Sequence, residues 1–492
     1  MSGGKIQIIS VGFEDIYLTF DPQITYFKMV YKRYTNFSQE PIIQYFNADT
    51  PSFGQRITCS IAKTADLISN IYLFVELPSI PINNNIDSFN YEYKWNKKIG
   101  YSLIKYTELE INGQLIDKLY SDWLNIWSLL TTTEEHQKSE DILIGNVSSL
   151  YDYSNGKDSY KLYVPLSFFF NRNKGLSLPI IALQVSDVKI HVEFNNLRDI
   201  LVPSYTHYIE IEDNIVFFKK NDVIKQNITG SDEINGIFHS FDYKTKKLYF
   251  TKYSKDFKYY NETSSYNKEK YHIYNENYKV SPKSNPVYIN PIYPNIDINK
   301  SHLIVNFIYL DNDERKKFIF SNHEYLITNI QYSGEKVITN INSKVKLDFI
   351  NCSKQLIWIA QYNKILRGNI NDKFNYTSDL NNNGSNIIEK TTLLQNGNIR
   401  SKDDDKYLYN YLQNYIYYNS SISEGINLFS FSIDPMSHQP TGACNFSKIN
   451  DFVLDIKLIS DISYDNPVII KVFSHGYNVL RINNGIGKLV FI

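Results

Sequence analysis

The chain has 492 residues, of which 42% are hydrophobic and 21% are charged, a composition typical of folded globular proteins and not of disordered ones. Its length favours two or three domains over a single compact core. Because 51 Lys and Arg residues almost balance 52 Asp and Glu residues, the formal net charge is -1 and we expect no direct nucleic-acid binding.

The cysteines and the N-terminus indicate the compartment in which the protein is made. Cys59, Cys352 and Cys444 lie far apart, and a sparse, odd set of cysteines makes a poor disulfide framework. Glu14 and Asp15 interrupt the only apolar stretch near the N-terminus, so we expect no secretory signal, and no long apolar window predicts a membrane span. We expect a soluble protein made in the cytoplasm.

Strand patterns dominate the first 205 residues, and few helices are predicted there. Asp21 and Pro22 suit a helix start, which predicts a helix over residues 21–34. Residues 71–77 are apolar on both faces and predict a covered central strand. Apolar residues at helical spacing predict a helix over residues 122–130, with Ser121 as its cap. Residues 188–194 (VKIHVEF) alternate strictly, which predicts a strand with one solvent-facing side.

Residues 206–299 differ from the rest of the chain. They are dense in Tyr, Lys and Asn, show little periodicity and end in a Pro-rich stretch. Residues 236–250 nevertheless consist of two aromatic strand patterns around a polar turn, which predicts a hairpin. We therefore interpret this region as an insertion that forms a surface β appendage.

Strand patterns dominate again from residue 300 onward. Residues 312–317 predict a short helical turn, with charge pairs possible within the cluster 311–317. Residues 345–349 and 452–458 alternate apolar and polar side chains, as half-buried strands do. Many short strands between Asn, Gly, Pro and Ser turns predict β-sandwiches or barrels, in two blocks of comparable size.

No motif predicts catalysis or metal binding. No two of the nine histidines are closer than sixteen residues, which excludes the HxH and HExxH spacings of common metal sites. His323 and Glu324 are neighbours on a predicted strand, so they point to opposite faces and cannot act together. His438 is interpreted as a structural turn residue, and Cys444, with apolar neighbours, as an inert thiol.

Two further segments resemble ligand loops only superficially. Residues 403–405 (DDD) lack the spacing of a calcium loop, and residues 483–488 (NNGIGK) lack the glycines, hydroxyl and following helix of a phosphate loop. We expect both to be turns, the second leading into the last strand. The sequence thus predicts no catalytic, cofactor-binding or metal-binding residues, and no cofactor.

Three segments, taken in chain order, carry a family resemblance. They are residues 3–38 (GGKIQIISVGFEDIYLTFDPQITYFKMVYKRYTNFS), residues 302–327 (HLIVNFIYLDNDERKKFIFSNHEYLI) and residues 438–451 (HQPTGACNFSKIND). Together they resemble signature segments of the major capsid proteins of nucleocytoplasmic large DNA viruses. The second segment departs from the family pattern, because Lys316 and Lys317 replace arginines, which puts any contact that needs two-pronged arginine pairing in doubt.

The resemblance implies an all-β fold of two consecutive eight-stranded jelly rolls, with few short helices and a long β-containing insertion. On this basis we expect an N-terminal arm over residues 1–24, a first jelly roll over 25–205, the insertion over 206–299 and a second jelly roll over 300–492.

The resemblance also implies function. We expect a structural protein of the virion capsid, not an enzyme, made in the host cytoplasm. Three copies would form a homotrimeric, pseudo-hexagonal capsomer that tiles an icosahedral shell. Its partners would be neighbouring capsomers, minor capsid proteins and an inner membrane layer beneath the shell. Two alternatives stay open: a minor or vertex capsid paralogue, and, in another class, a jelly-roll carbohydrate-binding protein or glycoside hydrolase.

Overall fold

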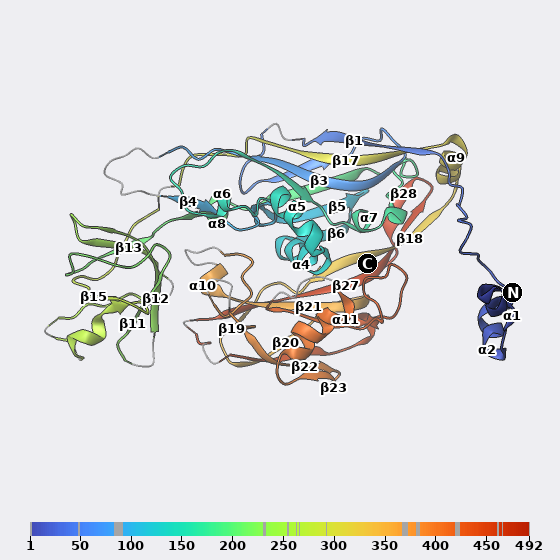
Figure 1. The fold of residues 1–492 in the computed structure, drawn as a ribbon. Coiled ribbons are helices and arrows are strands. Elements are labelled where there is room, and N and C mark those ends of the chain that lie inside the picture. Colours follow the sequence, from blue (N-terminus) through green and yellow to red (C-terminus); the bar gives the residue numbers. More distant parts are fainter. Residues whose placement is uncertain are drawn as a thin grey trace.

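The computed structural model of the protein describes residues 2–491, except for residues 48–49, 83–91, 230–232, 253–254, 262, 265, 292, 367–371, 380–383, 419–423, 460–461 and 465. Figure 1 shows a body of stacked β-sheets, an appendage at one end of it and an N-terminal arm at the other. No helix within the described residues is long and apolar enough to cross a membrane.

The first jelly roll is a sandwich of two four-stranded sheets. One sheet has the order β1-β17-β3-β7 and the other the order β2-β8-β5-β6. Their bounds are β1 (Phe37–Tyr45), β2 (Arg56–Ser60), β3 (Leu67–Leu77), β5 (Ile104–Ile111), β6 (Gln114–Tyr120), β7 (Tyr160–Pro165), β8 (Val188–Phe194) and β17 (Lys300–Leu310). The predicted strand over residues 188–194 is confirmed, since its alternate apolar side chains are buried in the core.

The structure moves one strand across the predicted boundary at residue 300. Strand β17 was expected in the second jelly roll, but it lies hydrogen-bonded between β1 and β3 of the first. It can occupy this central place because Leu303, Val305 and Phe307 form one buried face. Strand β1 is confined to the edge, where Pro41 costs no ladder hydrogen bond on the open side.

The second jelly roll has the same two-layer architecture. Its sheets have the orders β18-β27-β21-β24 and β20-β26-β22-β23, and β19, β25 and β28 extend the first of them. The bounds are β18 (His323–Tyr332), β19 (Lys336–Ile338), β20 (Asn342–Lys346), β21 (Cys352–Tyr362), β22 (Ile388–Gln395), β23 (Asn398–Asp403), β24 (Ile426–Ser430), β25 (Cys444–Asn445), β26 (Phe452–Leu458), β27 (Val468–Asn483) and β28 (Ile486–Leu489). The chain is therefore a double jelly roll.

Strands β21 and β27 are buried on both faces. Trp358 and Val472 face the core of the second roll, whereas Ile357, Ile359 and Phe473 belong to the large cluster centred on the first roll. One sheet of the second roll is thus sandwiched between its own partner sheet and the first roll. This double burial explains why both strands are apolar along most of their length.

Short helices occupy the connections between strands. They are α3 (Ile99–Leu103), α4 (Ser121–Thr131), α5 (Glu134–Ile144), α6 (Ser148–Tyr151), α7 (Phe169–Arg172), α8 (Leu197–Ile200), α9 (Asn312–Phe320), α10 (Asn363–Leu366) and α11 (Gln413–Tyr417). Helix α4 confirms the prediction over residues 122–130, although Tyr120 occupies the cap position and Ser121 is already helical. The Ser121 hydroxyl instead donates to the Tyr101 carbonyl oxygen. Helix α9 confirms the turn predicted at residues 312–317 and extends it.

The appendage is a seven-stranded sheet with its own small core. Its order is β15-β14-β11-β12-β13-β10-β16. The bounds are β10 (His207–Glu210), β11 (Val223–Asn227), β12 (Glu233–Asp242), β13 (Lys247–Lys252), β14 (Ile273–Tyr274), β15 (Lys279–Val280) and β16 (Val287–Tyr288). Strands β12 and β13 pair as the predicted hairpin. Just before the chain enters the appendage, β9 (Leu201–Pro203) pairs with β4 (Tyr93–Trp95) of the preceding part of the chain.

The N-terminal arm stands apart from the body (Figure 1). It contains α1 (Gly3–Ile9) and α2 (Phe13–Thr19), and every described residue before β1 is exposed. The helix predicted over residues 21–34 is wrong. Asp21 has φ of 51°, a left-handed conformation that ends a helix instead of starting one.

Candidate assembly surfaces

A buried ion pair joins the two jelly rolls. Lys471 on β27 lies 2.7 Å from the Asp122 carboxylate on α4, and the two side chains are only 3% and 10% exposed. Glu335 lies 3.9 Å from the same lysine. Two charges removed from water in this way are stable only when each keeps its partner. The pair therefore constrains how the second roll sits on the first.

A second polar cluster spans the same junction. The Arg172 guanidinium on α7 donates to Thr328 on β18, and it contacts His475 Nε2 on β27 at 2.9 Å. It also lies over the Trp127 ring of α4, 4.8 Å from its centroid. Because Arg172 can only donate, the Nε2 atom of His475 must accept, while the Nδ1 atom lies 3.0 Å from the side-chain amide of Gln355.

Backbone contacts complete the junction. The Asp117 carboxylate on β6 accepts from the Ile330 amide on β18, and Gln114 accepts from the Leu489 amide on β28. The Ser186 hydroxyl bonds to the turn between β27 and β28. Because these bonds are distributed along the junction, the two rolls form one unit and not two independent domains joined by a flexible linker.

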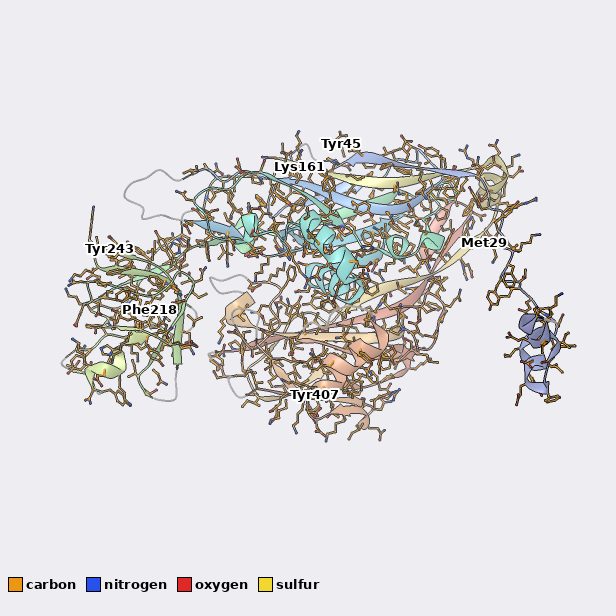
Figure 2. The ribbon with its side chains drawn as sticks, viewed as in Figure 1. Met29, Tyr45, Lys161, Phe218, Tyr243 and Tyr407 are labelled. Carbon is orange, nitrogen blue, oxygen red and sulfur yellow. The ribbon has the colours of Figure 1, made fainter. Side chains whose placement is uncertain are left out.

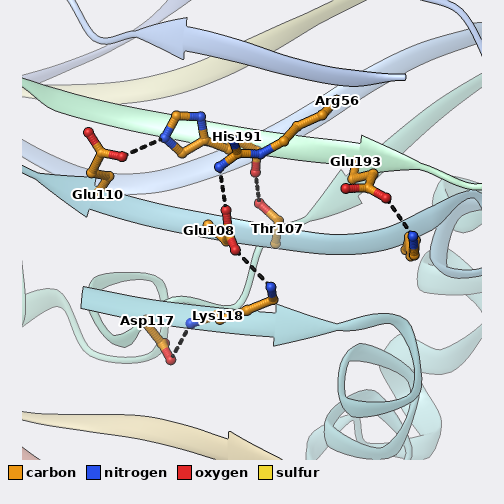
Figure 3. Close-up of polar contacts among 9 residues, drawn as sticks. Arg56, Thr107, Glu108, Glu110, Asp117, Lys118, His191 and Glu193 are labelled. Carbon is orange, nitrogen blue, oxygen red and sulfur yellow. Dashed lines mark hydrogen bonds and ion pairs between the residues drawn. The ribbon is translucent and has the colours of Figure 1, made fainter. Parts of the chain in front are cut away.

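The outer face of the sheet β2-β8-β5-β6 carries alternating charges (Figure 3). Glu108 accepts from Arg56 at 2.6 Å and pairs with Lys118 at 2.8 Å. Burial acts to raise the pKa of Glu108, but hydrogen bonds from Lys118 and Arg56 outweigh it and lower that pKa overall. On the same strand, Glu110 lies 3.0 Å from His191 of the neighbouring strand β8. The charged side chains named here are paired with one another, which suits contact with water or with a polar partner surface.

Two groups of exposed apolar side chains are relevant to assembly. The first is the arm, where Phe13, Leu18, Phe27 and Met29 are each at least 75% exposed; Figure 2 shows Met29 on the arm, away from the body. The second lies on the second roll around the helical segment 408–417. We call it the helical apolar patch, and its members are Tyr407, Leu412, Tyr415 and Ile416. Contiguous exposed apolar groups of this kind mark protein or membrane contact sites.

His323 has structural contacts, as predicted. His323 contacts the Phe318 carbonyl oxygen at 2.7 Å and stacks on its ring, while Glu324 pairs with Arg481. Neighbours on β18 thus serve different contacts, as their opposite orientation requires. His438 lies beside a cavity between the rolls.

The acidic and glycine-rich segments form turns. The Asp403 carboxylate accepts from the amides of Asp405 and Tyr409, which stabilises a turn after β23. Asn484 and Gly485 both have positive φ and connect β27 to β28. This is the geometry of a two-residue hairpin turn, for which Asn-Gly is preferred. Residues 483–488 therefore lead into the last strand, as predicted.

Cys444 and the cluster 311–317 have structural surroundings. All three cysteines are free, and burial raises the pKa of the Cys444 thiol. Arg315 pairs with Asp66 of the first roll, at 3.1 Å, instead of with an acidic neighbour on its own helix. Within the described ranges, no group of three His, Cys, Asp or Glu side chains could hold a metal ion.

Sequence reasoning missed the junction residues. Asp122 and Lys471 are 349 positions apart, and Arg172 and His475 are 303 apart. No local pattern marks such pairs. The only available signal was the charged residue inside each apolar segment, Asp122 before Trp123 and Lys471 within VIIKVF, since charges in buried segments need partners.

Two family models match most of the body. Residues 25–229 match the model described as "Major capsid protein N-terminus", and residues 314–488 match "Large eukaryotic DNA virus major capsid protein". Neither model includes the first helices of the arm.

Similar proteins span the whole chain. The chain is 39% identical to "Probable capsid protein 4" of Acanthamoeba polyphaga mimivirus, over 100% of the chain and 99% of that protein. It is 30% identical to the "Major capsid protein" of Pyramimonas orientalis virus, over 100% of both. These relatives are structural capsid proteins and not enzymes.

Solved structures share the fold. The VP54 protein of PBCV-1 superimposes with a TM-score of 0.64 at 21% identity, covering 95% of this chain and 100% of VP54. The Faustovirus major capsid protein superimposes with a TM-score of 0.67 at 12% identity, covering 96% of this chain and 94% of that one. The fold, the family models and the full-length relatives agree, and the chain belongs to the major capsid protein family of the large eukaryotic DNA viruses.

Proposed function

We propose that the protein acts as a homotrimer in which three copies place six jelly rolls around one axis, forming a pseudo-hexagonal capsomer that tiles the icosahedral shell of a large DNA virus. The observation that carries this proposal is the doubled architecture. Each roll is a sandwich of two sheets, each built on a run of four neighbouring strands, and a buried junction holds the rolls as one unit. Three such units supply six similar blocks, and six-sided objects tile a flat facet.

Electron microscopy of the purified chain tests the trimer. Negatively stained particles are expected to show three-fold symmetry with a six-cornered outline. A trimer interface of this obligate kind buries on the order of 2,000 Å² or more, so the particles should persist at nanomolar concentration. Compact single particles of two rolls at micromolar concentration would refute the proposal.

The helical apolar patch is proposed to lie in a contact between copies. Tyr415 is 80% exposed and Ile416 is 54% exposed in the single chain, and burying large apolar side chains of this kind stabilises association. Tyr415→Ser is expected to weaken the trimer while the fold of the single chain is retained. Tyr464→Ser, at another exposed tyrosine (87%) of the same roll, is the matched control. Equal effects of the two changes would remove the patch from the interface.

The arm is proposed to lie beneath the capsomer, against neighbouring capsomers, minor capsid proteins or an inner membrane layer. Its apolar side chains lack cover in the single chain, and it leaves the body at the end opposite the appendage (Figure 1). Deleting residues 2–36 is expected to leave the trimer intact and to abolish shell assembly. A full-length variant with Phe13, Leu18 and Phe27 changed to Ser should behave like the deletion. Unchanged assembly of either variant would contradict this role.

The appendage is proposed to face outward from the shell. It carries its own core, from Ile209 through Val280, and it is distant from the arm in Figure 1. Proteases added to intact particles are expected to cut within residues 206–299 before they cut the arm. Protection of the appendage, with prompt cleavage of the arm, would reverse the proposed orientation.

A second candidate role is that of a capsid protein with the same fold that is present in fewer copies per virion. The mimivirus protein called "Probable capsid protein 4" is 39% identical to this chain over its whole length, whereas "Capsid protein 1" of the same virus is 30% identical over 73% of the chain. Because one virus has at least two capsid proteins similar to this chain, a minor or vertex paralogue is the proposed alternative to the most abundant subunit. Quantitative mass spectrometry of purified virions separates the two, since a vertex protein would be present in far fewer copies. The reported relatives are capsid proteins and lend no support to a sugar-binding protein or glycoside hydrolase.

A further inference from the structure

A cavity of about 420 Å³ lies between the two jelly rolls. Its walls come from β3, α4 and α7 of the first roll and from β18, β21, β27 and the loop around His438 of the second. The side chains among its described lining residues that can carry a charge near neutral pH are all basic: Arg172, Lys354, His438 and His475. No Asp or Glu is among those lining residues.

The Arg172 guanidinium is only partly satisfied. Its Nε atom donates to the Ser167 carbonyl oxygen at 2.9 Å, and Nη1 contacts Thr328 and His475. Its Nη2 atom is buried and has no hydrogen-bond partner among the described atoms. A buried donor without an acceptor is costly, and it marks the place where an acceptor is missing.

Lys354 approaches from the opposite wall. Lys354 is 3% exposed, and within the described residues its Nζ atom forms no hydrogen bond or ion pair. The Nζ atom lies over the Tyr477 ring, 5.5 Å from the ring centroid. Burial, and then the charge of Arg172, lower the pKa of Lys354 to about 7. Burial followed by Lys354 lowers the pKa of His438 as well.

The nearest acidic groups do not neutralise this cluster. The charge of Asp434 raises the pKa of Lys354 and of the buried Tyr418, and the charge of Asp117 raises the pKa of Arg172. These are electrostatic effects without a hydrogen bond or ion pair among the described residues. Neither carboxylate lies within 4.0 Å of these two cations in the described part of the chain, and neither lines the cavity. The cavity therefore has an excess of positive charge and at least one unused donor.

We propose that this cavity binds a small polyvalent oxyanion of the phosphate class. A guanidinium fork matches two phosphate oxygens, and an ammonium group on the facing wall can bind a third. The volume exceeds that of one phosphate, so it has room for pyrophosphate. Because Arg172 belongs to the first roll and Lys354 to the second, the bound anion would bridge the rolls and stabilise their junction.

Titration calorimetry and thermal unfolding of the full-length protein test this site. Phosphate, pyrophosphate and acetate are added separately at pH 7 and equal ionic strength. We expect saturable binding of about one pyrophosphate per chain, weaker binding of phosphate, and a rise in melting temperature that follows occupancy. Acetate is expected to have no comparable effect. Equal, non-saturating responses to all three anions would indicate charge screening and would overturn the proposal.

Substitutions locate the site. Lys354→Met keeps the length of the side chain without the charge and is expected to weaken pyrophosphate binding about tenfold or more. Lys336→Met, at an exposed lysine on β19 of the same roll, removes the same charge far from the cavity and should leave binding unchanged. His438→Gln, in the loop, provides a second variant if Lys354→Met fails to fold, and it is expected to weaken binding measurably. Wild-type affinity in the folded variants would place the anion elsewhere and refute the inference.

Discussion

Replacing Asp122 by Asn tests the ion pair that joins the two jelly rolls. The change would leave Lys471 buried, with Glu335 at 3.9 Å as its remaining acidic partner among the described residues. The change would also remove the Asp122 carboxylate from Lys373. Burial lowers the pKa of Lys373 to about 8, and the charge of Asp122 acts in the opposite direction and raises it. Removing one partner of a buried pair costs about 3–5 kcal/mol. We expect a loss in this range for Asp122→Asn.

Lys471→Met is expected to cost less, because Lys373 still acts on the remaining Asp122 carboxylate. The matched control lies on the same strand. Arg481 on β27 pairs with Glu324 at 2.6 Å, but these side chains are 40% and 58% exposed. An exposed pair contributes about 0–1 kcal/mol, so Glu324→Gln should be nearly neutral.

Differential scanning calorimetry provides the assay. Unfolding entropy near 2.1 cal/mol/K per residue gives about 0.9 kcal/mol/K for a unit of roughly 450 residues, or about 1 °C per kcal/mol. Asp122→Asn should therefore lower the melting temperature by about 3–5 °C if the two rolls unfold together. A shift as small as that of Glu324→Gln would refute the assignment of this pair as a main stabiliser of the junction.

Two further predictions concern single residues of the body. Burial raises the pKa of Asp117 to about 6, so between about pH 4 and pH 6 the folded protein keeps a proton that the unfolded chain has lost. The free energy of unfolding therefore falls by up to about 3 kcal/mol as pH rises through this window. Urea unfolding across this pH range should show the loss in the wild type and not in Asp117→Asn, and the same pH dependence in both proteins would contradict it. Gly425 and Gly397 both have positive φ, but a Cβ atom at Gly425 would collide with the Tyr376 backbone, whereas one at Gly397 would meet open space. Gly397→Ala should lower the free energy of unfolding by about 1 kcal/mol, and Gly425→Ala should lower it clearly more. Equal urea midpoints for the two variants would show that the clash is relieved without loss of stability.

Local sequence patterns predicted the elements whose burial is local. The strand over residues 188–194, helix α4 and the hairpin β12–β13 follow from periodicity and turn residues that a short window contains. Val345, Leu347 and Phe349 are buried as their alternation indicates, although β20 ends at residue 346. The family resemblance supplied the double jelly roll, which periodicity alone could not.

Features that depend on distant partners were not predictable in this way. The sequence pattern of β17 is compatible with either roll, and only its pairing with β1 and β3 places this strand in the first roll. The arm helix α1 begins with two glycines and contains several isoleucines, residues of modest or poor helix propensity, so its pattern gave no helix signal. The basic cavity is formed by residues from both rolls, and each of them alone is an ordinary Arg, Lys or His.

The most direct test of the proposed function is the mass of the purified chain in solution, measured by multi-angle light scattering. A homotrimer has three times the chain's 57.6 kDa, or 172.8 kDa. The proposed capsomer predicts this mass at all concentrations that the instrument reaches. A well-folded species of 57.6 kDa that does not associate as concentration rises would contradict it.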